Sequence, residues 1–159
     1  MKASAKLQTA LAECSLHAEV LEEALKDWKR EHVSAEQVPN LTGLQRRVLD
    51  QLAYRFSKLQ DSLGEKVLPG VLELAEEPLP EETPFAVKLQ RLERLGVVEV
   101  EAWRKLRELR NQVAHEYIDQ PVLKAAAINR FLEGVAVLID TWRQTETFTG
   151  HRIKHSTEH

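Results

Sequence analysis

The chain has 159 residues, 43% of them hydrophobic and 30% charged, which predicts one globular domain and excludes a disordered or fibrous protein. Its formal net charge of −3 excludes binding to nucleic acid or anionic membranes through overall charge, so such binding would need a local basic patch. The single cysteine, Cys14, excludes an internal disulfide framework, and its helical surroundings favour a buried thiol over a reactive one.

No apolar run reaches the roughly 18 to 20 residues that a membrane-spanning helix needs. The first residues, MKASAKLQTALAE, also lack the uninterrupted apolar segment of a secretion signal. We therefore expect a cytoplasmic protein that makes no membrane contact.

The first half of the chain predicts two long helices. Apolar residues recur at spacings of three and four from about Ser4 to Glu31, as on one face of an amphipathic helix. Pro39 and Gly43 interrupt this pattern. A second helix starts near Thr42, and Gly64 or Pro69 is expected to kink or end it.

Three further helices are predicted in the second half. After the proline-rich segment EEPLPEETP, Thr83 is expected to cap a short helix that has Pro84 at its first position and stops at Gly96. A fourth helix spans roughly Val100 to Ile118. The fifth runs from Pro121 to about Thr145. VVEVE at 97–101 is the only candidate strand, and it lies against a stronger helical segment.

This pattern predicts an all-α fold, an antiparallel bundle of about five helices. We expect one domain over residues 1–147 and a flexible C-terminal tail over 148–159, because the tail has no apolar stripe. Trp28, Trp103 and Trp142 lie on or beside the apolar stripes, which favours the core or a dimer interface over base-stacking platforms.

The end of the fourth helix carries residues suited to phosphodiester chemistry. The segment RNQVAHEY contains Arg110, whose guanidinium can bind phosphate oxygens, and His115, which can exchange a proton near neutral pH. On a straight helix these two are about 140° apart around the axis and about 7.5 Å apart along it, too far to hydrogen-bond but able to reach one groove. Capping by His115 and a solvated arginine face are the structural alternatives.

This segment resembles the R-x-x-x-x-H-x-Y motif of HEPN domains, specifically the HepT-like toxins that are paired with a minimal nucleotidyltransferase (MNT) antitoxin. Arg110, His115 and Tyr117 match the motif residues, and Asn111 matches the polar residue that often follows its arginine. The resemblance extends over about residues 42 to 145.

The resemblance implies a two-fold homodimer with both motifs at the interface, which would let Arg110 and His115 of different chains meet. It implies a metal-independent endoribonuclease, the toxin of a type II toxin–antitoxin system, that needs no cofactor. Arg110 and His115 would be catalytic, with Asn111 and Tyr117 supporting them. The cognate nucleotidyltransferase would transfer AMP to Tyr117 and so block the ribonuclease.

Two interpretations stay open. Arg46, Arg47 and Arg107 belong either to solvated salt-bridge faces or to a basic patch that binds RNA phosphates. The protein itself is either this ribonuclease or a non-catalytic subunit that binds a nucleotidyltransferase and presents a substrate or nucleotide to it.

Overall fold

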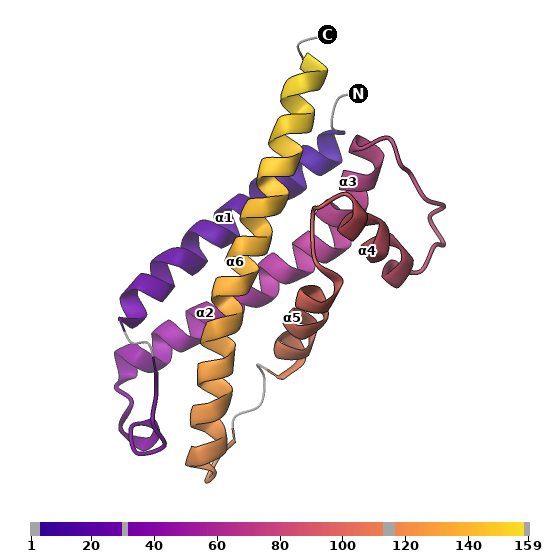
Figure 1. The fold of residues 1–159 in the computed structure, drawn as a ribbon. Coiled ribbons are helices and arrows are strands. Elements are labelled where there is room, and N and C mark those ends of the chain that lie inside the picture. Colours follow the sequence, from indigo (N-terminus) through magenta and orange to yellow (C-terminus); the bar gives the residue numbers. More distant parts are fainter. Residues whose placement is uncertain (1–3, 30–31, 113–116, 158–159) are drawn as a thin grey trace.

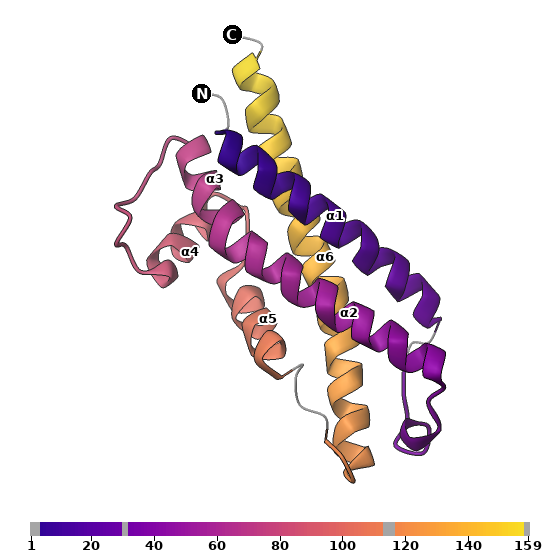
Figure 2. The same ribbon diagram turned by 180° about the vertical axis from the view of Figure 1, so that it is seen from behind.

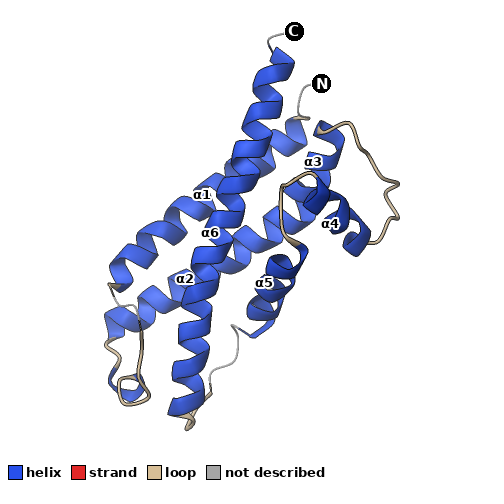
Figure 3. Ribbon diagram, viewed as in Figure 1, coloured by secondary structure: helices blue, strands red, loops and turns tan. Residues whose placement is uncertain are grey.

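The computed structural model describes residues 4–29, 32–112 and 117–157. Throughout these residues the regular structure is helical, without a strand (Figure 3). The helices are α1 (Ala5–Trp28), the 3₁₀ turn η1 (Val38–Asn40), α2 (Gly43–Ser62), the π-helical turn η2 (Leu63–Val67), α3 (Leu68–Leu74), α4 (Phe85–Arg94), α5 (Val100–Gln112) and α6 (Pro121–Thr157).

Helices α1 and α2 form an antiparallel pair with the most extensive contact in the described structure (Figure 1). Both begin at a side-chain cap. The Ser4 hydroxyl accepts a hydrogen bond from the Leu7 amide, and Thr42 and Gln45 cap each other's backbone amides in a capping box. The predicted start near Thr42 is therefore confirmed.

Helices α2 and α3 are one continuous rod, because the chain passes from one to the other through the π turn. The Leu68 amide donates to the Leu63 carbonyl, the wide spacing of a π-helix. This turn ends two residues before Pro69, whose ring would clash with the carbonyl of Glu65 in a regular α-helix. The rod thus continues through the Gly64–Pro69 region, where a kink or an end was expected.

Helix α4 begins one residue later than predicted. Its N-cap is Pro84 and it has no side-chain cap, so the expected cap at Thr83 is wrong. The end is as expected, because Gly96 follows the last turn with φ of +77°, a left-handed conformation that favours glycine.

Helix α6 corrects the prediction for the C-terminal segment. We expected a helix ending near Thr145 and a loose tail from residue 148, but α6 continues to Thr157. Phe148 and Ile153 pack against the core. The hydroxyls of Thr141 and Thr145 donate to carbonyls one turn earlier, which lets polar residues occupy a buried helix face.

The rod and α1 cross α6 on one side of it, as the view from behind shows (Figure 2). Helix α5 packs against both α2 and α6. Gly134 of α6 permits this contact, since a Cβ there would lie 2.2 Å from Cδ1 of Leu109. Trp28, Trp103 and Trp142 are buried in the core, as predicted.

Counting the α2–α3 rod as one helix, the described residues form five helices around one core, which confirms the predicted all-α bundle. None of the described helices combines the length and the apolar character that crossing a membrane requires.

Candidate functional site

Helix α5 carries the candidate phosphate-binding residues between two cavities. Its inner face is anchored by Trp103 and Leu106, both buried. Arg107, Arg110 and Asn111 follow on the side that faces the α2–α3 rod and α4, where they line the first cavity.

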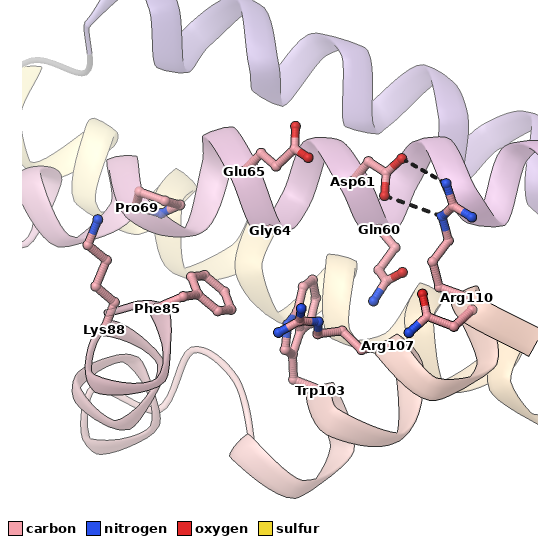
Figure 4. A pocket seen from close by; sticks show the side chains of 11 residues that line it. Gln60, Asp61, Gly64, Glu65, Pro69, Phe85, Lys88, Trp103, Arg107 and Arg110 are labelled. Carbon is pink, nitrogen blue, oxygen red and sulfur yellow. Dashed lines mark hydrogen bonds and ion pairs between the residues drawn. The ribbon is translucent and has the colours of Figure 1, made fainter. Parts of the chain in front are cut away.

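We call this first hollow the arginine cavity (Figure 4). Its volume of about 580 Å³ is within the range of small-molecule sites. Three elements surround it: the rod, α4 and α5. The lining residues are Gln60, Asp61, Gly64, Glu65, Pro69, Phe85, Lys88, Trp103, Arg107, Arg110 and Asn111.

Arg110 is held side-on by Asp61 of α2. Its Nε lies 3.4 Å from Oδ1 and its terminal nitrogen 3.4 Å from Oδ2. These contacts are long for charge-assisted hydrogen bonds, which are usually about 2.7–2.9 Å. The side chains of Arg110 and Asp61 are also 38% and 44% exposed. A pair of this kind contributes little stability, so an anion in the cavity can compete with Asp61 for the guanidinium.

The cavity has a cationic side and a buried polar wall. In the part of the chain that the structure describes, Lys88 and Arg107 have no ion-pair partner, whereas Arg110 has Asp61. Gln60 and Trp103 are only 4% and 2% exposed. The Gln60 Oε1 and Trp103 Nε1 atoms are buried with no hydrogen-bond partner among the described residues.

The second hollow, which we call the tyrosine groove, lies on the other side of the C-terminal end of α5. It has a volume of about 520 Å³, and polar and apolar side chains both line it. Its lining residues are Val38, Leu41, Gly43, Arg46, Arg47, Leu49, Asp50, Ala53, Leu109, Gln112, Tyr117, Lys124, Ala127, Ile128 and Phe131.

The structure thus divides the predicted basic residues between two sites. Arg46 and Arg47 line the tyrosine groove together with Tyr117. Arg107 lines the arginine cavity. Tyr54, which shares a helix face with Arg46 in the sequence, is instead 54% exposed, with the guanidinium of Arg55 stacked 5.5 Å from its ring centre.

The end of α5 differs from the predicted helix to Ile118. The described part of α5 ends at Gln112, and Tyr117 has a positive φ of 53°, outside the α-helical region. Arg110 and Tyr117 consequently line different cavities, although a straight helix would turn them the same way. His115 lies outside the described residues.

Several residues of these walls were missed by sequence reasoning. Gln60, Asp61 and Phe85 come from other helices and have no motif spacing with Arg110. Their apolar neighbours predicted the helices, but the side that faces α5 depends on how α2 and α4 pack.

Cys14 is fully buried on α1, as its helical setting predicted. Burial, with a smaller contribution from the charge of Glu13, raises the pKa of its thiol to about 12. The thiolate is therefore absent at neutral pH, and Cys14 is no candidate nucleophile. Within the described ranges, no group of three or more His, Cys, Asp or Glu side chains is arranged to hold a metal ion.

Comparison with known proteins identifies no relative: no family model, curated protein or solved structure matches the chain.

Proposed function

We propose that the protein is a metal-independent endoribonuclease, the HepT-like toxin of a toxin–antitoxin pair whose antitoxin is an MNT-type nucleotidyltransferase. Arg110 and His115 would be its catalytic residues. Asn111 would help to position the phosphate, and the active form would be a two-fold homodimer.

The observation that carries this proposal is the position of Arg110 on the wall of a nucleotide-sized cavity. Its guanidinium is accessible, and among the described residues it is held by two long contacts to Asp61. Lys88 and Arg107 line the same cavity, and three further cations, Arg46, Arg47 and Lys124, line the tyrosine groove beyond the end of α5. Against these six cations the two hollows carry three carboxylates, those of Asp50, Asp61 and Glu65. This local excess of positive charge supports RNA binding by a chain whose net charge is −3.

The proposed reaction needs only groups that the chain and the RNA supply. Neutral His115 removes the proton from a ribose 2′-hydroxyl, and the 2′-oxygen attacks the adjacent phosphorus. The bond from phosphorus to the 5′-oxygen breaks, which leaves a 2′,3′-cyclic phosphate, and the released 5′-oxygen takes up a proton. Arg110 stabilises the negative charge that develops on the phosphate oxygens.

Cleavage of single-stranded RNA by the purified chain in EDTA tests this proposal. We expect His115→Ala to lower the rate by about 100-fold or more, because it removes the general base. We expect Arg110→Ala to lower it by a similar factor through lost charge stabilisation. The matched control is Arg104→Ala on the same helix, since Arg104 is 65% exposed and pairs with Glu101.

Undiminished cleavage in the His115→Ala protein would contradict the assignment. If neither the chain nor its transferase complex cleaves RNA, and the complex forms equally well with Arg110→Ala, the non-catalytic subunit becomes the better explanation.

We further propose Tyr117 as the AMP acceptor. An AMP group on Tyr117 would add bulk and negative charge to the tyrosine groove beside Arg46 and Arg47, two of the cations proposed to support RNA binding. Intact mass spectrometry after co-expression with the transferase should show an increase by whole AMP units. Tyr117→Phe should abolish the increase, whereas Tyr54→Phe, at the chain's only other tyrosine, should retain it. Modification of the Tyr117→Phe protein would assign the acceptor elsewhere.

A further inference from the structure

The buried wall of the arginine cavity carries two polar groups that lack partners in the described structure. The Trp103 indole Nε1 is a hydrogen-bond donor, and the Gln60 Oε1 is an acceptor. Both side chains are more than nine-tenths buried and line the cavity, and the two polar atoms themselves are covered in the free protein, so a ligand reaches them only when these side chains move. Gln60 extends from α2 toward α5, on which Trp103 and Arg110 stand (Figure 4).

These two groups are suited to the edge of a nucleobase. Each base carries adjacent donor and acceptor atoms on its Watson–Crick edge, which complement an amide oxygen and an indole N–H. Rotation about the terminal torsion of Gln60, which is soft for an amide, turns the oxygen toward a ligand. A base also has a flat ring that can lie against the aromatic surface beside these groups, which inorganic phosphate lacks, so the cavity favours a ligand with a base.

The same cavity offers aromatic surface close to the polar wall. The rings of Phe85 and Trp103 lie 6.3 Å apart between centres and are tilted by 52°. Phe85 is only partly buried, so its ring presents surface on which a base can stack. Gly64 leaves room for the indole, since a Cβ there would lie 2.8 Å from Cζ2 of Trp103.

Helix α5 provides the cations that would bind the phosphate of such a ligand. Arg110 and Arg107 are about one helical turn apart and line the cavity together. In the free protein, Asp61 contacts the guanidinium of Arg110 at two distances of 3.4 Å. A phosphate can replace these contacts with shorter hydrogen bonds.

We infer that the arginine cavity binds one nucleotide of the RNA strand, with its base against Phe85, the base edge on Gln60 and Trp103, and its phosphate on Arg110. This inference rests on the proposed ribonuclease function and adds a base-binding site to it. Asp61 then keeps Arg110 in position in the free protein and gives way to the phosphate on binding.

The test uses AMP, CMP, GMP, UMP, inorganic phosphate and a short single-stranded RNA, each titrated into the full chain carrying His115→Ala. Calorimetry gives the affinity, and the assigned Trp103 Nε1–H resonance reports on the indole. We expect nucleotides and RNA to shift this resonance downfield, as hydrogen bonding does. We expect Gln60→Leu to weaken nucleotide binding about tenfold, the effect of one lost hydrogen bond at the upper end of its usual range.

The matched control is Gln90→Leu, since Gln90 is an exposed residue of α4 outside the cavity lining. Gln60→Met provides a second variant if the leucine does not fold. Should both fail, the Trp103 resonance of the chain without a Gln60 change still decides.

Equal affinity for phosphate and for nucleotides, with no change in Gln60→Leu, would overturn the base site. So would nucleotide binding that leaves the Trp103 resonance in place, or mononucleotide binding with which RNA does not compete. The outcome is separable from the proposed function: binding without cleavage by the chain with intact His115 would remove the ribonuclease and keep the site. RNA cleavage without nucleotide binding in the cavity would keep the ribonuclease and remove the base site.

Discussion

His17 of α1 and Arg55 of α2 meet across the interface of these two helices, with His17 Nδ1 2.9 Å from a guanidinium nitrogen. Since arginine only donates, His17 Nδ1 accepts, and the imidazole is neutral with its proton on Nε2. Burial, followed by the charge of Arg55, lowers the pKa of His17 from 6.5. Lys58 and Lys66 lower this pKa further, whereas Glu13 opposes them.

This contact predicts a loss of stability in mild acid. The unfolded chain protonates His17 near pH 6.5 and the folded chain only at lower pH, so the free energy of unfolding decreases as pH falls below 6.5. Once His17 is protonated in both the folded and the unfolded chain, it lowers the free energy of unfolding no further. His17→Gln keeps an acceptor for Arg55 and removes the titration. Urea unfolding between about pH 8 and pH 5 should give a shallower pH dependence for this variant, and parallel curves would contradict the assignment.

At the level of helices, the sequence predicts the helices whose apolar residues are regularly spaced and whose ends carry a capping residue. Helix α2 is such a case, because Thr42 and Gln45 form a local capping box. The continuation of α6 past Thr145 was missed because Thr149 is polar, yet it is buried with its hydroxyl bonded to the carbonyl of Glu146. Whether a threonine satisfies its hydroxyl within the helix depends on burial, which a linear pattern does not contain.

The candidate site was predictable only where its residues share one regular helix. Arg107, Arg110 and Asn111 share a cavity because they belong to one helix, and helical spacing relates their directions. Helical spacing does not predict the direction of the Tyr117 side chain, because the positive φ of Tyr117 places it outside the regular helix. Asp61 was out of reach altogether, since its contact with Arg110 joins residues 49 positions apart.

At the scale of the whole molecule, exposed apolar side chains lie close in sequence to residues that line the tyrosine groove. Ile118 precedes α6, Val122 and Leu123 belong to its first turn, and the three are 76%, 70% and 51% exposed. Leu44, at the start of α2 next to the groove-lining Gly43, is 64% exposed. Exposed apolar side chains that form one patch are often covered by a partner, and a homodimer would provide such a cover for these residues.

The proposed dimer predicts that two inactive variants restore each other. If Arg110 of one chain acts with His115 of the other, a heterodimer of Arg110→Ala and His115→Ala chains contains one intact site of two. We expect about half the activity of the unsubstituted dimer, as two-fold symmetry requires. Differently tagged chains can be co-expressed, purified through both tags and assayed on RNA in EDTA.

Each variant homodimer is the control and should remain inactive. An inactive heterodimer would show that Arg110 and His115 of the same chain work together, and would remove the shared site from the proposal.

The wide turn at Leu63–Val67 sets the rotational phase of everything that follows it in the rod. Each residue of an α-helix advances the side-chain direction by about 100°. A π turn holds one residue more than the α-helical turn it replaces, so deleting one residue at this turn restores a regular helix and keeps Val71 and Leu72, now buried, directed at the core. The same deletion in the regular part of α2 would rotate Val71 and Leu72 by about 100° away from the core. We therefore expect a one-residue deletion to be far more disruptive in α2 than at the π turn.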